Sequence, residues 1–348
     1  MIRRRMSRPI TVGDVTVGAG APVVVQSMAK TDTRDARATI KQIRRLEECG
    51  CQMVRVAVPD GEAAASIPTI KPLISIPLIA DIHFDYRLAL LALQGGVDGL
   101  RLNPGNISDP EQIKDVVLAA KERNVPIRIG VNAGSLRSAE NKEQTIVERM
   151  VGSALEQIKL LESLDFELIK VSLKAFDVPD TVAANRALAE RMPYPIHLGI
   201  TEAGTTRSGV IRSAAGIGIL LHHGIGDTIR VSLTGDPCEE VFAGYEILKA
   251  LDLSQRGPTL ISCPSCGRTE VDIIGLANAV EERLSKLKKS IKVAVMGCVV
   301  NGPGEARDAD VGIACGKRRG VIFRNGKQVR TVEEVDFLSA LMAEVAAF

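Results

Sequence analysis

The 348-residue sequence contains no tryptophan, and only 3% of its residues are aromatic. Proteins that bind single-stranded nucleic acid stack bases on aromatic side chains, so we expect no base-stacking surface here. The formal net charge of +2 is close to neutral, which argues against a dominant nucleic-acid-binding surface. The basic start, MIRRRMSRPI, is interpreted as a solvated tail rather than a nucleic-acid-binding arm.

The sequence also lacks an apolar run of about 18 residues, the length that a membrane-spanning helix needs. Its basic N-terminus lacks the apolar segment of a secretion signal, so we expect no membrane association and a cytoplasmic protein. The chain has seven cysteines, an odd number that cannot all form pairs, and no export signal. This favours reduced thiols over a disulfide framework. Cys49 and Cys51 are expected to be buried as small apolar side chains, and Cys238 to have a structural or neutral role.

Between residues 23 and 235 the sequence alternates short apolar, β-branched runs with helical segments. The helical segments have helical apolar spacing and end in glycine, a common helix stop. Strand–helix alternation predicts a parallel sheet, and eight units favour a closed (β/α)8 TIM barrel of the α/β class. The alternative, an open doubly wound sheet, lacks a GxGxxG motif after the first strand. The expected strands are 23–28, 53–58, 77–83, 99–104, 127–132, 168–175, 195–203 and 228–235.

Two domains are predicted. Residues 1–255 form the substrate-binding TIM barrel, and the alternating segment 10–18 is expected to be a β-hairpin that closes the barrel bottom. Residues 256–348 form a smaller α+β domain that ends in a helix over 331–348, with Thr331 as its N-cap.

Charged residues collect at the carboxyl ends of the expected strands, where TIM barrels place their chemistry. Charges inside parallel strands cost free energy unless they are paired or used. Four arginines and Lys174 outnumber the nearby acids, Asp81 and Glu202, and this surplus favours a polyanionic ligand such as a diphosphate over a purely structural ion-pair network. His83, beside Asp81, fits either a ligand-binding or a structural role. The four arginines are Arg55, Arg101, Arg128 and Arg230.

The smaller domain carries a Cys-x-x-Cys pair, Cys263 and Cys266 in ISCPSCGR, and a further cysteine, Cys298, in MGCVVNGPGE. One interpretation is a zinc site with Cys315 as the fourth ligand, although the second close pair of a zinc ribbon is missing. The other is an iron–sulfur cluster, because three cysteines can leave one iron open or differently ligated. The spacing alone does not decide between them.

A series of motifs, in order along nearly the whole chain, resembles the 4-hydroxy-3-methylbut-2-enyl diphosphate synthase family of the methylerythritol phosphate pathway. CPSCGR and MGCVVNGPGE are the most specific of them. The other motifs are VQSMAKTDTRD (25–35), ADIHFDYRLAL (80–90), RLNPGNI (101–107), GVNAGSL (130–136), KVSLKAF (170–176) and GITEAG (199–204).

The resemblance implies an oxygen-sensitive [4Fe–4S] oxidoreductase of isoprene biosynthesis. It implies reductive ring opening of 2-C-methyl-D-erythritol 2,4-cyclodiphosphate, loss of water, and formation of 4-hydroxy-3-methylbut-2-enyl diphosphate. Flavodoxin or ferredoxin would supply the two electrons. A homodimer is also implied, in which the cluster domain of one subunit covers the barrel of the other. The chain corresponds to the short two-domain form.

The resemblance also assigns roles to single residues. Cluster ligands would be Cys263, Cys266, Cys298 and Glu305, whereas Cys315 would be a bystander. Glu305 would be the ligand that substrate oxygen displaces, and it is counted with Glu202 as catalytic. The diphosphate would be bound by Arg55, Arg101, Arg128, Lys174, Arg230 and Ser232. Asn132, Thr201 and Glu202 would face the carbon skeleton and hydroxyls, with Asp81, His83 and Asn103 at the rim.

Two other hypotheses compete with this one. A non-enzymatic iron–sulfur carrier would not need the cationic barrel mouth. A zinc-bearing barrel enzyme would hydrolyse or condense a phosphate ester, and its protein would be colourless, whereas an iron–sulfur protein is brown.

Overall fold

The structure is a computed structural model that describes residues 2–102, 109–136, 144–298, 304 and 309–348. The chain divides into two compact units, Met1–Ser254 and Gln255–Phe348. Within the described residues, no helix combines the length and the apolar character that crossing a membrane would require.

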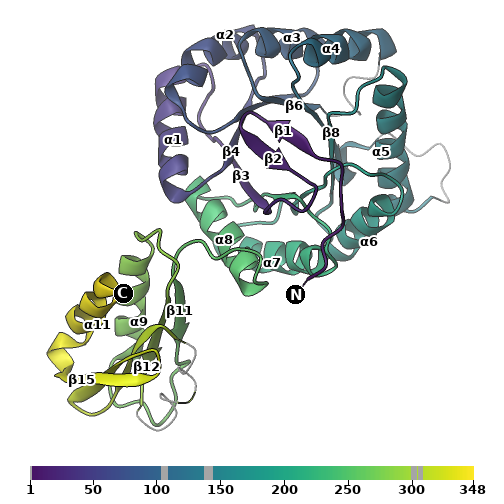
Figure 1. Ribbon diagram of the computed structural model, residues 1–348. Coiled ribbons are helices and arrows are strands. Elements are labelled where there is room, and N and C mark those ends of the chain that lie inside the picture. Colours follow the sequence, from purple (N-terminus) through teal and green to yellow (C-terminus); the bar gives the residue numbers. More distant parts are fainter. Residues whose placement is uncertain (1, 103–108, 137–143, 299–303, 305–308) are drawn as a thin grey trace. The chain divides into compact units, whose positions relative to one another are not determined.

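The first unit is a barrel whose described part contains eight parallel strands surrounded by helices (Figure 1). The strand order is β8-β7-β6-β5-β4-β3-β10-β9. A parallel bridge between Val171 and Ile196 links the end strands, so the barrel is nearly closed and the predicted TIM-barrel fold is confirmed. The strands are β3 Val24–Met28, β4 Met53–Ala57, β5 Leu78–Ile82, β6 Gly99–Leu102, β7 Ile127–Asn132, β8 Ile169–Lys174, β9 His197–Leu198 and β10 Thr228–Ile229.

Helices follow the strands and cover the outside of the barrel (Figure 1). Several start at an aspartate whose carboxylate accepts a backbone N–H of the first turn, as Asp60 does before α2 and Asp236 before α8. Each buries an apolar stripe against the strands; α1 buries Ile43 and Leu46. The helices are α1 Ala36–Cys49, α2 Gly61–Ile70, α3 Tyr86–Gln94, α4 Pro110–Glu122, α5 Ile146–Ser163, α6 Val178–Ala189, α7 Thr206–His222 and α8 Pro237–Ala250, with short 3-10 turns at Lys71–Leu73 and Ala133–Ser135.

The last two barrel strands are much shorter than the predicted runs 195–203 and 228–235. The chain leaves regular strand geometry after Leu198, and Glu202 has a φ of 54°, in the left-handed region that interrupts a strand. Thr201, Glu202, Arg230 and Ser232 therefore lie on loops beyond the strand ends, at the same end of the barrel.

A hairpin closes the opposite end of the barrel. β1 (Ile10–Val12) pairs with β2 (Val15–Val17) across a turn at Gly13, whose φ is 60°. Apolar side chains of the hairpin pack against Val24, Met53 and Ile79, which stand at or near the first residue of their strands. This apolar plug separates the barrel interior from solvent at the amino ends of the strands.

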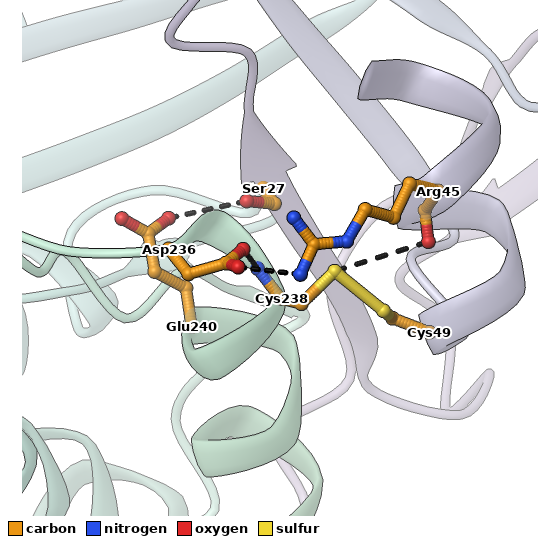
Figure 2. Close-up of a disulfide and its surroundings, with 6 residues drawn as sticks. All are labelled: Ser27, Arg45, Cys49, Asp236, Cys238 and Glu240. Atoms are coloured by element: carbon orange, nitrogen blue, oxygen red, sulfur yellow. Dashed lines mark hydrogen bonds and ion pairs between the residues drawn. A yellow bond between two sulfur atoms is a disulfide. The ribbon is translucent and has the colours of Figure 1, made fainter. Parts of the chain in front are cut away.

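Barrel closure places the first helix next to the last one. β10 pairs with β3, and α1 then lies against α8 (Figure 2). Cys49, the last residue of α1, forms a disulfide with Cys238 in the first turn of α8, 189 residues away, with Cα atoms 6.0 Å apart. Next to it, Arg45 Nη2 lies 2.5 Å from Asp236 Oδ2.

The disulfide corrects two expectations. Cys49 is exposed and not buried, and it is not a free thiol. Its partner is distant in sequence and becomes a neighbour only when the barrel closes, so spacing along the chain could not reveal the pair. Cys51 is buried, as predicted.

The second unit is an α+β domain built on a sheet with the order β11-β12-β13-β14-β15 in the described residues. The first three strands are parallel, and the rest antiparallel. Ile273, Val293, Ile313 and Leu341 belong to a core between this sheet and two helices. The elements are β11 Thr259–Ser262, α9 Ile273–Leu284, β12 Lys292–Met296, β13 Val311–Cys315, β14 Arg319–Arg324, β15 Lys327–Glu333 and α11 Phe337–Ala347, preceded by a 3-10 turn at Glu334–Asp336.

The predicted start of the terminal helix is wrong. Thr331 pairs with Val321 in the β14–β15 hairpin and caps no helix. The Asn-Gly turn at Asn325 lets the chain return along β14, and the backbone hydrogen bonds of that pairing hold residues 327–333 extended. The helix begins only at Phe337.

Candidate functional site

A buried carboxylate organises one side of the barrel mouth. Asp81, at the end of β5, lies 2.9 Å from Arg101 Nη1 and 3.4 Å from Arg55 Nε. His83 Nε2 lies 3.4 Å from Asp81 and 3.0 Å from Arg101 Nη1. Burial alone would raise the pKa of Asp81, but Arg55, the hydrogen bond from His83, and Arg101 outweigh it and hold that pKa well below its usual range. Asp81 is therefore a permanent anion that orients two arginines.

Two further cations face the same interior without a carboxylate partner in the described structure. Arg128 is 4% exposed, and its Nε and Nη1 atoms have no hydrogen-bond partner among the described residues. Burial lowers the pKa of Arg128 and of Lys174, and repulsion from neighbouring arginines lowers both further. Buried, unpaired cations are unfavourable unless an anion binds them. Their arrangement therefore favours an anionic ligand.

A neutral histidine supports Lys174 from below. His197, in β9, is fully buried, and burial followed by repulsion from Lys174 lowers its pKa well below the usual value. Its Nε2 lies 3.3 Å from Lys174 Nζ, and its Nδ1 lies 2.8 Å from Thr228 Oγ1. In the neutral ring, Nδ1–H donates to Thr228, and Nε2 accepts from Lys174. The lysine is thus held by an uncharged acceptor, and no carboxylate among the described residues neutralises it.

The fifth cation is paired with an acid that sequence reasoning missed. Arg230 Nε and Nη2 each lie 3.3 Å from Oε2 of Glu240, which is in α8 and 1% exposed. Glu202, one of the two acids expected near the cations, is exposed on its loop. The available signal was the pair of adjacent acids Glu239 and Glu240, which follows the predicted eighth strand after a short turn. Only Glu240 is buried, whereas Glu239 is exposed.

Two glycines make room for these side chains. A Cβ atom on Gly130 would lie 2.6 Å from Arg101 Nε, and one on Gly199 would lie 2.6 Å from Lys174 Nζ. Any larger residue at either position would displace a cation. Glycine at these two positions therefore leaves the space that the Arg101 and Lys174 side chains occupy.

In the part of the barrel that the structure describes, the five predicted basic side chains and Lys30 lie around two buried carboxylates, Asp81 and Glu240. Basic groups therefore outnumber acidic groups at the mouth. This surplus lets the mouth bind an anionic group such as a diphosphate.

The other predicted barrel residues surround this cluster less closely. Asn132 ends β7 opposite Lys174 of β8 and is half-buried. Thr201 and Ser232 are also half-buried, on the loops that follow β9 and β10. Asn103 lies outside the described residues, so the structure does not place it.

In the second unit, the three candidate cysteines lie on the segments that follow the parallel strands β11 and β12. Cys263 follows β11 and Cys298 follows β12 by two residues, and these strands are parallel. The Cys263 backbone N–H donates to Val295 O at 3.0 Å. Thr269 Oγ1 accepts from the Cys266 backbone N–H at 3.1 Å. A Cβ on Gly297 would lie 3.2 Å from the Thr269 side chain, so the 263–269 loop and the 297–298 segment are adjacent.

These thiols suit a soft metal centre by their chemical type. No set of three His, Cys, Asp or Glu side chains among the described residues is arranged to hold a metal ion, and Glu305 lies outside those residues. Cys263, Cys266 and Cys298 are half-buried or exposed and so remain accessible. Thiolates are the ligands that iron–sulfur clusters use, so the donor type fits such a cluster.

Cys315 is a poor candidate for a ligand. It ends β13, is fully buried, and packs in the same apolar core as Phe337 and Leu341. Burial raises the pKa of its thiol to about 12, which disfavours the thiolate that a metal requires. The zinc interpretation with Cys315 as the fourth ligand loses its support.

Comparisons with known proteins cover almost the whole chain. Residues 7–245 match the model of the GcpE TIM-barrel domain, and residues 259–347 match that of the GcpE protein C-terminal domain. A protein of Dehalococcoides mccartyi is 61% identical over 347 residues, covering 100% of both chains, and is named 4-hydroxy-3-methylbut-2-en-1-yl diphosphate synthase (flavodoxin). A protein of Geobacter sulfurreducens with the same name is 59% identical, covering 97% of both.

Among solved structures, dihydropteroate synthase from Stenotrophomonas maltophilia matches with a TM-score of 0.55 and 14% identity, covering 71% of this chain and 98% of that one. This likeness concerns the barrel fold alone.

Proposed function

The chain belongs to the GcpE family, and from this premise we propose how its residues carry out the family's reaction. The enzyme is an iron–sulfur oxidoreductase of isoprenoid biosynthesis. It opens the ring of 2-C-methyl-D-erythritol 2,4-cyclodiphosphate reductively and forms 4-hydroxy-3-methylbut-2-enyl diphosphate.

The overall reaction explains why the barrel mouth needs surplus positive charge. One C–O bond to the cyclic diphosphate breaks, one hydroxyl leaves as water, and two electrons and a proton enter. The ring oxygen that stays on phosphorus becomes a terminal oxygen, so the diphosphate gains negative charge as the ring opens. Cations already placed around it stabilise that charge more in the transition state than in the substrate.

We assign the diphosphate to the cationic cluster. Arg128 and Lys174, which lack a carboxylate partner in the described structure, would contact it most strongly. Asp81 and Glu240 hold the other cations in place. The residues proposed to bind the diphosphate are Arg55, Arg101, Arg128, Lys174, Arg230 and Ser232.

The carbon skeleton and hydroxyls would face the loops at the strand ends. Asn132 and Thr201 supply hydrogen-bonding groups there, and His83, Asp81 and Asn103 complete the rim. Glu202 is proposed to orient the departing hydroxyl or give it a proton. Its side chain is exposed, and its backbone is in the left-handed region.

The cluster is proposed to be of the [4Fe–4S] type, held by Cys263, Cys266, Cys298 and Glu305. When bound, it supplies electrons one at a time to the reaction. Glu305 would be the non-thiolate ligand, and a carboxylate binds such iron more weakly than a thiolate does, so this would be the exchangeable position of the cluster. The thiols that follow β11 and β12 support this assignment.

Several properties of the whole assembly are also proposals. Flavodoxin is the electron donor named for the relatives, and we propose it or a ferredoxin for this chain. We propose a cytoplasmic homodimer in which residues 256–348 of one subunit cover the barrel, residues 1–255, of the other. Such a dimer would bring a cluster to the cations that bind the diphosphate.

The unpaired cations of the barrel mouth are the observation that carries the proposal, and an anaerobic assay tests it. Purified brown protein, the cyclodiphosphate and a chemical reductant should give the open-chain diphosphate. Absorbance near about 400 nm is expected from thiolate-bound iron–sulfur centres. A colourless, zinc-containing protein, or a brown protein that leaves the cyclodiphosphate unchanged, would contradict the proposal.

Glu305→Ala tests the carboxylate ligand. We expect the variant to retain part of the 400-nm absorbance, because three thiolates still hold the cluster, and to lose most of its turnover. Iron content, absorbance and product formation are measured side by side. Full activity at unchanged iron content would remove Glu305 from the mechanism.

A further inference from the structure

Among the described residues of the barrel, Glu240 is a carboxylate with several hydrogen-bond and ion-pair partners and no direct part in the proposed reaction. Its side chain is completely buried. Besides its ion pair with Arg230, the carboxylate accepts a hydrogen bond from the Ser27 hydroxyl at 3.1 Å and one from the Leu233 backbone N–H at 3.1 Å. Lys30 Nζ lies 3.0 Å away. Figure 2 shows it on α8, with its carboxylate directed toward Ser27 on β3.

These contacts join three parts of the barrel at one carboxylate. Ser27 and Lys30 come from β3 and the loop after it, Arg230 and Leu233 from the segment after β10, and Glu240 from α8. Lys30 Nζ also donates to Leu233 O at 2.7 Å, so Leu233, which follows Arg230 closely in the chain, is held through both its backbone N–H and its carbonyl. The Arg230 backbone N–H still donates to Leu198 O of β9 at 3.0 Å, so the sheet holds the backbone at this residue. The position of its guanidinium is set by side-chain contacts.

Without Glu240, Arg230 would be repelled from the position it occupies. Arg55 Nη2 and Arg230 Nη1 lie 2.9 and 3.8 Å from the same atom, Met28 Sδ, so the two guanidiniums are neighbours and repel one another. A guanidinium that is 13% exposed has a route toward solvent. The paired carboxylate is what offsets this repulsion.

We infer that Glu240 is a positioning residue that holds Arg230 in the diphosphate site. The inference rests on the proposed function, because Arg230 is assigned to the diphosphate there. The alternative role is simple charge compensation, in which Glu240 only reduces the field of the cations. The two roles differ in sign, since removing a compensating negative charge strengthens anion binding, whereas releasing Arg230 weakens it.

Glu240→Asp separates the two roles because it keeps the charge and withdraws the carboxylate by one methylene. The dissociation constant of inorganic diphosphate, measured by calorimetry on the full chain, should rise about tenfold, the loss expected for one well-placed charged hydrogen bond. Glu240→Gln should also weaken binding. The matched control is Glu239→Gln, an exposed neighbour in the same turn of α8, which should leave affinity unchanged.

A double-mutant cycle shows whether Glu240 acts through Arg230. Arg230→Ala should weaken diphosphate binding, and adding Glu240→Asp to it should cost less than about twofold more. Equal costs in both backgrounds would overturn the inference, and so would unchanged affinity of Glu240→Asp or tighter binding by Glu240→Gln. If Glu240→Asp does not fold, Ser27→Ala, which removes one hydrogen bond to the Glu240 carboxylate, should weaken diphosphate binding by about two- to threefold, and this effect should disappear in the Arg230→Ala background. Absence of diphosphate binding by the wild-type protein would instead contradict the proposed function, on which the inference depends.

Discussion

At the scale of single residues, Lys170 shows how burying a basic group in the barrel interior lowers the stability of the folded protein. It precedes Lys174 by four residues on β8 and so faces the same side, deeper in the barrel. It is 3% exposed, and its Nζ has no hydrogen-bond partner among the described residues. Burial, followed by repulsion from Arg128, lowers the pKa of Lys170 to about 7, although Asp227 acts in the opposite direction. The free energy of unfolding therefore depends on pH through this buried amine.

The sign of this dependence follows from proton linkage. Between about pH 7 and the ordinary lysine value of 10.5, the unfolded chain binds a proton that the folded chain does not. Folded stability should therefore rise with pH through this window, by up to about 1.4 kcal/mol per pH unit from this group. Below pH 7 the full penalty of the buried charge applies.

Lys170→Met should remove that penalty. The variant keeps a side chain of similar length, so we expect it to be more stable than the wild type at pH 6.5, with an advantage that shrinks toward pH 9.5. Free energies of unfolding measured by denaturant at several pH values test this. The control is Lys121→Met, at an exposed position of α4. Parallel pH curves for the wild type and Lys170→Met would show that the amine is not destabilised by burial.

At the scale of elements, the important contacts lie where regular structure stops. β9 and β10 each contain two residues, and the candidate residues after them stand on loops. The start of α8 then acts as a support for those loops. It carries Glu240, and it is joined to the end of α1 by the Cys49–Cys238 disulfide and the Arg45–Asp236 ion pair (Figure 2). α8 thus links barrel closure to the placement of Arg230.

The disulfide makes a countable prediction. Cluster-free protein, unfolded without reductant, should titrate five thiols, and the same protein after reduction should titrate all seven. The double variant Cys49→Ser/Cys238→Ser should give five thiols in both conditions. Seven thiols in the unreduced wild type would mean that the two cysteines are free.

The cross-link should also stabilise the barrel. Closing a loop over a separation of 189 residues restricts the unfolded chain and contributes up to about 5 kcal/mol in the chain-entropy account. Reductant should therefore lower the unfolding midpoint of the wild type and leave that of the double variant unchanged.

At the scale of the whole molecule, the two kinds of chemistry belong to separate compact units. The cation cluster lies within Met1–Ser254, and the candidate cluster cysteines lie within Gln255–Phe348. Each unit has an apolar core of its own. Diphosphate binding and electron delivery should therefore be separable by mutation.

Cys298→Ser tests this separation. Loss of one thiolate should remove the visible absorbance and the turnover. The dissociation constant of inorganic diphosphate should change by less than about twofold, because the altered residue lies outside the barrel. The comparison protein is Cys51→Ala, in which a buried thiol of the barrel is altered. A large loss of diphosphate affinity in Cys298→Ser would show that the two units form one site.

Much of this fold could be predicted because its signals are local. Alternating strands and helices predicted the barrel, and the positions of Arg55, Asp81, Arg101, Arg128 and Lys174 at strand ends predicted the cation cluster, since parallel strands end at the same face. The family resemblance rested on motifs, which are also local. The length of strands seven and eight was predicted poorly, because their strand-like sequence continues after Leu198 and Ile229, where the regular strand pairing ends.

The sequence by itself determined the barrel, the type of ligand and the family, because composition, periodicity and motifs need no knowledge of distant neighbours. Only the tertiary structure decided which charges are paired. It paired Arg230 with Glu240, left Arg128 and Lys174 without a carboxylate among the described residues, joined Cys49 to Cys238, and buried Cys315 in an apolar core. The physical reason is closure of the barrel: it brings the first and last strand–helix units together, and the short-range contacts that form there depend on distance in space and not on distance along the chain.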